Sequence, residues 1–562
     1  MELYLKDYLQ QCGNDASLAA ALALNEAKTG DTLHLGGGTL HFYPQNASQD
    51  FYYISNNDYG LKNIAFLIKN KTDFTIDGDG ADLIFHGHIL PFALHQNNGV
   101  TVKNLSVDYE YAMFAQAKIT AANSEFVDLQ FDQKTFCAKV KDGKFCFYSE
   151  QDGWEHISEP LVTEFDPKTC APTAFQRYYF PISGEIDTSN FLSVIMHKVR
   201  LEQLQEGVIR MHGKLPYLHT VGNYWVATHA SREYPGFLLT ETANTVLENL
   251  HLYHTTGMGV VGQLSHNITL KQVIMAPRPG SGRMLSVNAD ASHFVNCTGT
   301  VLLEGCRFVS LMDDCCNIHG NYLRCKQVLN PNTALLTFGH SQQKGVLNLK
   351  AGDTVRLFAP EEMNPCASLT LQSAALLRDD LVLLKTEQPL PAEFGPDYLT
   401  ESYDRMPQVH IKNCEFGANR PRGVLVSTNK KAVVEHCKFY NMNAAIQIGG
   451  EVKNWLESGS VEDVLIENNE FCNAAYAGDY VLDFAPRGMK ESNTFVHQNI
   501  TVQNNHFEMN DRRILKAAYC KNLRFVNNTF THNPALPNQG EQGNGFLTEK
   551  LFDCTIEPLK ES

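Results

Sequence analysis

Three aspartates stand out as residues that could carry out acid–base chemistry. Asp290 lies in the segment RMLSVNADASHFVNC, and Asp313 and Asp314 lie in the segment FVSLMDDCCNIHG. If the three carboxyl groups share one small volume, they cannot all ionise easily, so at least one pKa should rise. Such a site keeps one carboxylic acid protonated beside an ionised carboxylate that can act as a base.

The interval between the aspartates indicates how they could meet. Asp290 and Asp313 are 23 residues apart. In a parallel solenoid with coils of that length, an offset of one coil places two residues on the same face, about 4.8 Å apart. Asp314 can join them only if the chain turns at this point, because consecutive strand residues point to opposite faces. The competing interpretation is structural, since Asp-Asp pairs are common in turns.

Several other polar residues could bind a substrate beside the aspartates. The candidates are Asn288, His293, Asn317, His319, Arg232, Arg278 and Asp108. Each of them alone can also be explained as a satisfied polar side chain, and the arginines could simply pair with acids. Trp154, Trp225 and Trp455 could stack on sugar rings, although core packing is the commoner role. No group of histidines and acids has the spacing of a metal site, so we expect no metal.

A repeated phrase predicts the elements that would position these residues. Apolar and polar residues alternate, Asn or a small residue follows, and Phe ends the phrase, as in VHIKNCEF, AVVEHCKF, VLIENNEF, ITVQNNHF and LRFVNNTF. From Phe416 onward, the final Phe residues are separated by 23, 32, 36 and 23 residues. Such spacing is typical of a parallel β-solenoid, in which stacked coils bury one continuous core. Asn tolerates the left-handed backbone of the turns and can stack on Asn of the next coil.

The chain is therefore expected to be all-β, with a parallel β-helix as its main body. Residues 17–28 (SLAAALALNEAK) predict a helix that caps the open end of the first coil. Two stretches lack the coil ending and contain hairpin-like turns, which predicts antiparallel β insertions. The expected organisation is a cap with the first coils at 1–114, an inserted β domain at 115–229, central coils with the aspartates at 230–320, a second inserted β domain at 321–406, and C-terminal coils at 407–562.

Composition and charge argue against several classes of partner. The 562 residues are 43% hydrophobic and 19% charged, as in ordinary globular proteins. A formal charge of −16 argues against nucleic acids and anionic membranes, which need a basic face, but not against a neutral sugar. No apolar run reaches membrane-spanning length, and no secretory signal is visible. With the odd count of 15 cysteines, this favours a cytoplasmic protein with reduced thiols. The sequence leaves a homo-oligomer open.

These motifs resemble a known group of carbohydrate-active enzymes. The coils, the NAD segment ending at Asp290 and the later DD segment are similar to the pectate-lyase-like right-handed β-helix superfamily. The order NxD…DD…HG is similar to polygalacturonases, but their Gly-His-Gly and Arg-Ile-Lys signatures are missing. A closer resemblance, over most of the chain, is to glycoside hydrolase family 110, the exo-α-1,3-galactosidases. It is carried by YYISNNDYGLKNIAF, FTIDGDGADLIFHG, REYPGF, RMLSVNADASHFVNC and MDDCCNIHG.

The resemblance implies hydrolysis of terminal α-1,3-linked galactose with inversion, from linear Galα1-3Gal or blood-group-B-like glycans, without a metal or organic cofactor. The family's three catalytic aspartates fall on Asp290, Asp313 and Asp314. By analogy with the pectinases, Asp313 is the general acid, and Asp290 and Asp314 hold the attacking water as base. Many relatives are exported, so the missing secretion signal bears on the location and natural substrate of this protein, although not on its chemistry.

Two other functions stay open at the level of the sequence. One is a different β-helix glycosidase that acts on an acidic polysaccharide, as polygalacturonases do. Such a site needs several Lys or Arg residues for uronate carboxylates, and the segments around the aspartates offer only Arg278, Arg283, Arg307 and Arg324. The other is a glycan-binding β-helix without catalysis, which has no reason to concentrate three carboxylates at coil spacing.

Overall fold

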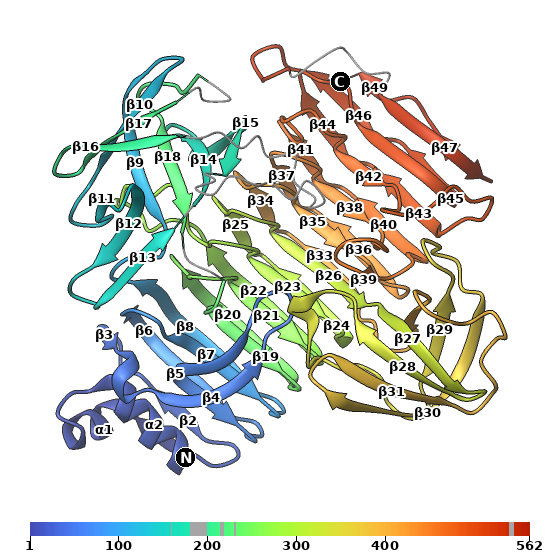
Figure 1. The fold of residues 1–562 in the computed structure, drawn as a ribbon, viewed down its shortest axis with the longest axis horizontal. Coiled ribbons are helices and arrows are strands. Elements are labelled where there is room, and N and C mark those ends of the chain that lie inside the picture. Colours follow the sequence, from blue (N-terminus) through green and yellow to red (C-terminus); the bar gives the residue numbers. More distant parts are fainter. Residues whose placement is uncertain (159, 180–198, 214–217, 230–231, 539–544, 562) are drawn as a thin grey trace.

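The chain folds mainly as a long stack of parallel coils, which runs from the blue N-terminal corner to the red C-terminal corner of Figure 1. The computed structural model describes residues 1–158, 160–179, 199–213, 218–229, 232–538 and 545–561. Successive coils contribute strands to three columns of parallel, hydrogen-bonded strands, here named A, B and C. The expected all-β parallel solenoid is therefore confirmed.

The three aspartates lie at the entrances of strands of column A. Column A contains β5 (Tyr59–Lys69), β7 (Leu90–His95), β19 (Phe237–Thr240), β21 (Val260–Gln263), β23 (Ser292–Val295), β26 (Cys316–Asn321), β35 (Val424–Val426), β38 (Ile446–Ile448), β42 (Leu482–Phe484), the start of β45 (Leu515–Val526) and β47 (Phe546–Phe552). Column B contains β1 (Glu2–Tyr4), β2 (Thr32–His34), the first parts of β6 (Thr75–Phe85), β8 (Thr101–Tyr109), β20 (Ala243–Leu252) and β22 (His266–Met275), then β24 (Thr298–Glu304), β33 (Gln408–Lys412), β36 (Lys431–Glu435), β40 (Asp463–Glu467), β43 (His497–Gln503), the end of β45 and β48 (Thr555–Ile556). Column C contains β3 (Thr39–Phe42), the second parts of β6, β8, β20 and β22, then β25 (Arg307–Val309), β34 (Glu415–Gly417), β37 (Lys438–Tyr440), β41 (Glu470–Cys472), β44 (His506–Met509), β46 (Thr529–His532) and β49 (Lys560–Glu561).

Identical or similar side chains stack from coil to coil inside the solenoid. Phe439, Phe471 and Phe507, which end the repeated phrases, form a column with ring centroids 5.2 and 4.7 Å apart. Beside it, each backbone N–H at the turn donates to the buried side chain one coil further on. This ladder consists of Cys306, Cys414, Cys437, Asn469, Asn505 and Asn528. The ladder satisfies buried backbone donors and holds the coils in register.

Two helices cover the N-terminal end of the coils, α1 (Leu5–Gln11) and α2 (Ala16–Glu26). The sequence predicted only the second, with slightly later boundaries. Asp15 caps α2 by accepting a hydrogen bond from the N–H of Leu18 at 3.0 Å. The buried alanines of α2 join the core of the first coils, as expected of a cap. No helix in the described part of the chain is long and apolar enough to span a membrane.

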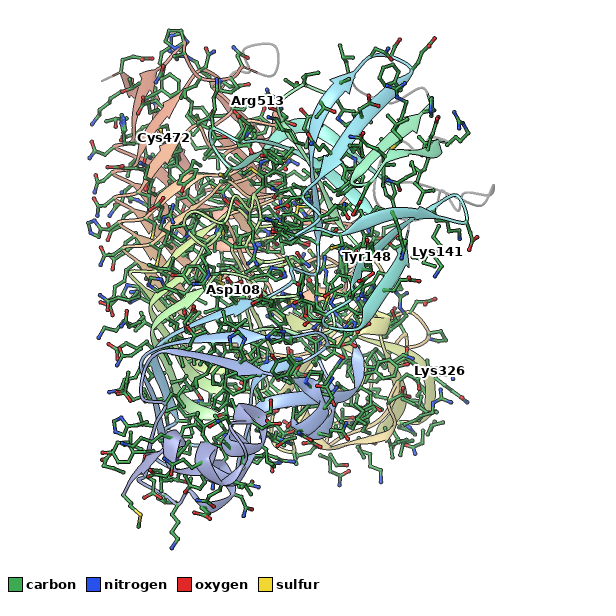
Figure 2. The ribbon with its side chains drawn as sticks, turned by 90° about the vertical axis from the view of Figure 1, so that its left-hand side faces the viewer. Asp108, Lys141, Tyr148, Lys326, Cys472 and Arg513 are labelled. Atoms are coloured by element: carbon green, nitrogen blue, oxygen red, sulfur yellow. The ribbon has the colours of Figure 1, made fainter. Side chains whose placement is uncertain are left out.

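Two domains are inserted between coils, and both lie on the same side of the stack. In Figure 2, Lys141 and Tyr148 mark the first and Lys326 marks the second, whereas Cys472 lies on the coils. The first contains a seven-stranded sheet of β15 (Ala171–Tyr179), β14 (Leu161–Asp166), β18 (Tyr224–Thr228), β9 (Ala115–Ala122), β10 (Phe126–Phe131), β17 (Val208–His212) and β16 (Arg200–Gln205), with a smaller sheet of β11 (Ala138–Lys141), β12 (Lys144–Ser149) and β13 (Trp154–Ser158). The second is a closed barrel of β27 (Leu323–Asn330), β28 (Thr333–Phe338), β31 (Leu381–Thr386), β30 (Ala367–Arg378), β29 (Thr354–Phe358) and β32 (Leu399–Ser402).

A hairpin that was not foreseen as a separate element covers the outer face of column A in the first coils. It consists of β4 (Ser48–Tyr53), paired antiparallel with β5. Tyr52, Ile54 and Ile64 of the hairpin bury Leu238 and Val261 of column A in a second apolar cluster. At the hairpin turn, the N–H of Ser55 donates to the side-chain oxygen of Gln263 of β21 at 2.9 Å, so the turn lies against column A.

Candidate active site

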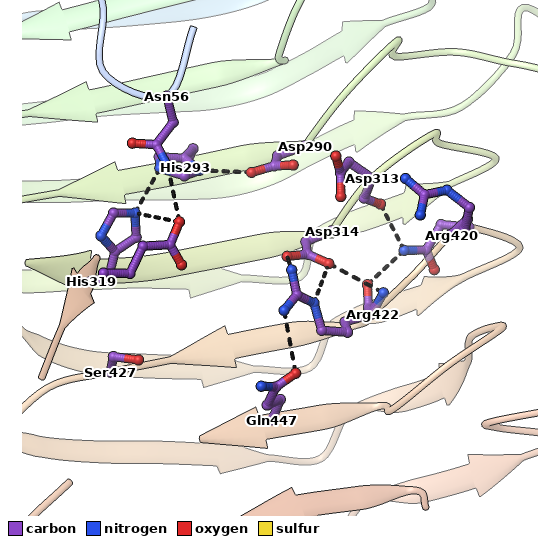
Figure 3. Close-up of polar contacts among 12 residues, drawn as sticks. Asn56, Asp290, His293, Asp313, Asp314, His319, Arg420, Arg422, Ser427 and Gln447 are labelled. Atoms are coloured by element: carbon purple, nitrogen blue, oxygen red, sulfur yellow. Dashed lines mark hydrogen bonds and ion pairs between the residues drawn. The ribbon is translucent and has the colours of Figure 1, made fainter. Parts of the chain in front are cut away.

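The three aspartates lie at the entrances of two neighbouring strands of column A (Figure 3). Asp290 precedes β23, and Asp313 and Asp314 precede β26. Because Ser292 pairs with Cys316, the coil offset aligns Asp290 with Asp314, not with Asp313 as the interval of 23 residues suggested. The backbone bends at Asp313, before β26 begins. This bend lets two consecutive carboxyl groups reach one site.

The three carboxyl groups are close enough to act together. One oxygen of each lies within 4.8 Å of an oxygen of the other two. The side chains of Asp290 and Asp314 are only 5% and 1% exposed. The side chain of Asp313 is 16% exposed. Asp313 is therefore the member most accessible to a ligand that arrives from solution.

Two arginines balance part of this negative charge. Arg422 holds Asp314 in a bidentate ion pair, with Nε 2.8 Å from Oδ1 and Nη2 2.7 Å from Oδ2. Arg232 donates Nη2 to Oδ2 of Asp313 at 2.8 Å. Arg232 was predicted from the sequence, whereas Arg422 was missed. The pairing of β26 with β35 would have revealed Arg422, because it precedes β35 just as Asp314 precedes β26.

Burial controls the protonation of the aspartates. It raises the pKa of the Asp290 carboxyl well above its usual value, and the charge of Asp313 raises it further against the opposing charges of Arg232 and Arg422. Burial also raises the pKa of Asp314, although Arg422 opposes the shift. The cluster therefore holds a proton at pH values where an exposed aspartate has already lost it.

A buried chain of hydrogen bonds leads away from Asp290. His293 Nδ1 lies 2.7 Å from Oδ2 of Asp290, and His293 Nε2 lies 3.0 Å from Nε2 of His319. His319 Nδ1 contacts the carbonyl oxygen of Gly320 at 2.7 Å. Both histidines were predicted to bind substrate, but they are only 1% and 0% exposed, so neither ring faces the solvent.

The direction of these hydrogen bonds indicates where the proton lies. A carbonyl oxygen can only accept, so Nδ1 of His319 carries a hydrogen and, in the neutral ring, Nε2 accepts. Nε2 of His293 must then donate, which leaves Nδ1 of His293 to accept a hydrogen from Asp290. Burial lowers the pKa of His293 to about 4 and also lowers the pKa of His319, so both rings are neutral near pH 7. The chain of bonds thus favours a protonated Asp290 in the free protein.

Glu457 lies beside His319, at the far end of this buried chain, and was missed by the sequence analysis. It begins β39 (Glu457–Ser458), which pairs antiparallel with the end of β26. Oε1 of Glu457 lies 3.4 Å from Nε2 of His319 and accepts a hydrogen bond from Asn56 of the hairpin turn at 2.9 Å. Burial opposes its ionisation, whereas Arg422 and, when they are protonated, His319 and His293 lower the pKa of the Glu457 carboxyl. The ionised Glu457 in turn raises the pKa of Asp290.

Replacing Glu457 by Gln should shift the pH–activity profile to lower pH. Gln preserves the shape and can still accept from Asn56, but it removes a negative charge beside His319, so the aspartate cluster should lose its proton at lower pH. We expect kcat to fall at the alkaline side of the optimum while KM changes little, measured as kcat and kcat/KM across pH.

Glu462→Gln is the matched control for this experiment, because Glu462 lies on the same segment but pairs with Arg356 of the second barrel. Its profile should coincide with that of the unmodified protein. If Glu457→Gln also leaves both limbs of the profile in place, the buried chain does not set the protonation of the aspartates.

The two predicted asparagines lie beside the aspartates. Asn317 is aligned with His293 on the neighbouring coil and is 4% exposed. Asn288 donates from Nδ2 to the carbonyl oxygens of Met113 and Thr256. The side-chain oxygen of each has no hydrogen-bond partner among the described residues. Asn288 therefore ties the first inserted domain to the coil that carries Asp290.

Arg278 and Asp108 lie apart from the aspartates, in a second ion cluster. Arg278 binds Asp108 at 2.6 Å and Asp82 through both terminal nitrogens, while Arg283 binds Asp108 at 2.5 Å. Within the described ranges, no hydrogen bond or ion pair joins Arg278 or Asp108 to Asp290 or Asp314. Their mutual pairing, which the sequence could not show, joins neighbouring coils.

The spacing of the aspartates would also permit a metal ion. However, both oxygens of Asp314 already accept hydrogen bonds from Arg422, and Arg232 binds one oxygen of Asp313. A cation would have to displace these guanidinium groups, so the donor set suits acid–base chemistry better than metal binding. Two other groups of possible ligands occur among the described residues, namely His41, His86 and Glu110, and His34, Asp77 and Asp79.

Three family models match the chain. A right-handed beta helix region matches residues 398–557. GLAA-B beta-barrel domain I matches residues 115–224, and GLAA-B beta-barrel domain II matches residues 333–398. The two barrel models fall on the two inserted domains, and the helix model gives the hand of the coils.

Relatives with similar sequences extend over nearly the whole chain. Alpha-1,3-galactosidase A of Shewanella woodyi is 33% identical over 93% of this chain and 84% of that protein. Alpha-1,3-galactosidase B of Bacteroides thetaiotaomicron is 31% identical over 89% of this chain and 80% of that protein. Among solved structures, a family 28 exopolygalacturonase of Yersinia enterocolitica is similar at a TM-score of 0.38 and 10% identity, covering 100% of this chain and 79% of that one. The chain therefore belongs to glycoside hydrolase family 110, the α-1,3-galactosidases, and its coils form a right-handed β-helix.

Proposed function

We propose that this chain is an exo-acting hydrolase that releases terminal α-1,3-linked galactose from oligosaccharides or glycans with inversion of configuration. The observation that carries the proposal is the cluster of three aspartates with oxygens within 4.8 Å, on a chain 33% identical to an α-1,3-galactosidase. A cluster of one shared proton and at least one ionised carboxylate provides both the acid and the base that glycoside hydrolysis needs.

In the proposed mechanism, Asp313 protonates the glycosidic oxygen, and Asp290 and Asp314 hold and deprotonate the attacking water. A water that donates to two carboxylate oxygens at about 2.8 Å each spans roughly 4.5–5 Å between them, which the aspartate spacing accommodates. The greater exposure of Asp313 supports its role as the residue that contacts the leaving group.

Charge in the site must be rearranged before Asp313 can act as the acid. Arg232 favours the ionised form of Asp313 in the free protein, whereas Asp290 favours a proton. We infer that the cluster carries one shared proton, which reaches Asp313 once the substrate has entered. In the alternative assignment, Asp290 itself donates the proton. The two assignments predict different rates for the variants Asp290→Asn and Asp313→Asn.

A panel of purified α-linked substrates tests the proposed function. We expect galactose release from Galα1-3Gal, and release at least tenfold slower from Galα1-4Gal and Galα1-6Glc, because the position of the leaving oxygen sets its distance from Asp313. A blood-group-B trisaccharide, compared with the linear disaccharide, shows whether a fucose branch is accepted. Release of galacturonate from polygalacturonate without galactosidase activity would instead support the polygalacturonase-like function, and binding without any release would support a glycan-binding protein.

A further inference from the structure

Two histidines and a glutamate, here named the histidine group, meet in the first coils and play no part in the mechanism above. His41 lies in β3, His86 directly follows β6, and Glu110 directly follows β8. One ligand atom from each, a ring nitrogen or a carboxylate oxygen, lies within 4.8 Å of those of the other two. The three residues are 45 and 24 positions apart in the chain, so no short sequence motif shows them together.

The stacking of the coils explains why these side chains converge. In column C, Phe42 pairs with Phe85, and Phe85 pairs with Tyr109. These three aromatic side chains are buried in the core of the solenoid. Because side chains alternate along a strand, the residues that flank them point to the outer face of column C. His86 and Glu110 are therefore neighbours on successive coils, on the same face as the histidine of β3.

The ring of His86 is held in place by two contacts. Its Nδ1 lies 2.8 Å from Oδ1 of Asp152, which belongs to the turn between β12 and β13 of the first inserted domain. The other oxygen of Asp152 accepts a hydrogen bond from the N–H of Gly87 at 3.1 Å. The ring of Tyr43 stacks on His86 with centroids 4.2 Å apart. Metal-bound histidines usually donate their second ring N–H to a carboxylate in this way.

The hydrogen bonds leave a lone pair of His86 directed into the group. An ionised Asp152 can only accept, so Nδ1 of His86 carries the hydrogen and Nε2 has a free lone pair. This Nε2 lies 3.0 Å from Nδ1 of His41. In the ion-free protein, His41 can donate a hydrogen to it. When the hydrogen of His41 lies on its other ring nitrogen, both lone pairs face one space that Glu110 also reaches.

The donor atoms suit a transition-metal ion. Bonds of about 2.0–2.1 Å place the ligand atoms of a tetrahedral zinc ion roughly 3.4 Å apart, so a small side-chain movement would open the two nitrogens enough. Imidazole is a ligand for zinc and similar ions, whereas Mg²⁺ and Ca²⁺ require mainly oxygen. His41 and Glu110 are exposed, which gives an ion access and leaves room for water as a fourth ligand.

The histidine group differs in this respect from the three aspartates. Guanidinium groups of Arg232 and Arg422 bind Asp313 and Asp314 and would compete with a cation. Within the parts of the chain that the structure describes, no lysine or arginine forms an ion pair with Glu110. A cation at the histidine group would therefore meet two imidazoles and an available carboxylate.

We propose that the histidine group binds one divalent transition-metal ion of the zinc type, with His41, His86 and Glu110 as ligands and Asp152 orienting His86. The ion joins β3 to the ends of β6 and β8, and through Asp152 it fixes a turn of the first inserted domain on the coils. Its role is structural, so this inference goes beyond the proposed function and does not depend on it. The sequence-based expectation of no metal then fails at this site and stands at the aspartates.

Zinc binding to the intact, chelator-stripped protein, measured by isothermal titration calorimetry, tests the inference. We expect one tightly bound Zn²⁺ ion per chain. Asp152→Asn should weaken binding by about 10- to 100-fold, the usual effect of losing the partner of a metal-bound histidine. His41→Ala and Glu110→Gln each remove a ligand at an exposed position and should weaken binding more than Asp152→Asn does.

Two further measurements identify the ligands and the role of the ion. X-ray absorption at the zinc edge should show only nitrogen and oxygen ligands at about 2.0–2.2 Å, whereas sulfur at about 2.3 Å would indicate cysteines. Zn²⁺ should raise the Tm of the unmodified protein and leave the Tm of His41→Ala unchanged, because an ion that binds only the folded state stabilises it. Turnover of Galα1-3Gal well below the Tm should be the same with and without Zn²⁺.

His34→Ala is the matched control, because His34 lies in another group of possible ligands but its ring nitrogens contact Glu2 at 2.7 Å and Asp79 at 3.1 Å. It should bind Zn²⁺ as the unmodified protein does, and loss of the tight site in this variant would place the ion elsewhere. Absence of a tight site in the unmodified protein, sulfur ligation, or normal binding by folded His41→Ala and Glu110→Gln would each overturn the inference. None of these results bears on galactose release, so the proposed function would stand.

Discussion

Replacing Asp313 by Asn should lower kcat on Galα1-3Gal by about 10²–10⁴-fold, the usual contribution of a general acid. KM should change far less, because the proton is needed only in the transition state. An aryl α-galactoside with a good leaving group needs little protonation, so its hydrolysis should be partly spared. The measurement is kcat and KM for the disaccharide and the aryl galactoside with the same enzyme preparation.

Asp290→Asn is the partner experiment that separates the roles of the two residues. If Asp290 helps to activate water, the variant should lose rate with both substrates, because attack by water still needs a base. If instead Asp290→Asn spares the aryl galactoside and Asp313→Asn does not, Asp290 is the acid. This outcome would require a protonated Asp290, which is the state that its hydrogen bond to His293 favours in the free protein. An Asp313→Asn variant with nearly full turnover on the disaccharide would exclude Asp313 as the acid.

The fold could be predicted because the solenoid repeats its pattern within each coil. Alternation, a turn with Asn and a buried Phe recur locally, and the stacking of Phe439 on Phe471 follows from that pattern. The exact register could not be predicted, because insertions of variable length in the turns change the coil length. A shift of one residue was enough to align Asp290 with Asp314 instead of Asp313.

The partners of the aspartates were harder to predict, because they come from distant parts of the chain. Arg422 follows the second inserted barrel, and Glu457 reaches His319 through a short strand, β39, that has no distinctive pattern. The turn that contains Asn56 was visible as an Asn-rich motif, but only the folded hairpin places it against Glu457. Sequence reasoning found the residues that share a coil motif and Arg232, but it missed Arg422, Glu457 and Asn56, which long-range contacts bring to the site.

The configuration of the first product is the second decisive result, and we expect β-galactose from the α-linked substrate. With Asp290 and Asp314 holding water, the water attacks the anomeric carbon directly and inverts it, so no glycosyl-enzyme should accumulate. The aspartates are closer together than the roughly 6.5–9.5 Å usual for inverting enzymes and nearer to the roughly 5–5.5 Å of retaining ones. Because this spacing is nearer to that of retaining enzymes, proton NMR of the sugar released at early times is the measurement that distinguishes inversion from retention.

Arg422 gives a physical reason to expect inversion in spite of this short spacing. A retaining enzyme needs a carboxylate oxygen that attacks carbon, and the bidentate ion pair with Arg422 makes Asp314 a poor nucleophile, although Oδ2 can still accept a hydrogen bond from water. One oxygen of Asp290 is bound to His293. The rate should follow a bell-shaped pH profile, and the raised pKa values of Asp290 and Asp314 should place its alkaline limb well above that of an isolated aspartic acid.

Chelators should leave the rate unchanged. Initial release of α-galactose, or activity lost in EDTA and restored by Ca²⁺ or Zn²⁺, would overturn this mechanism in favour of a retaining or metal-dependent site.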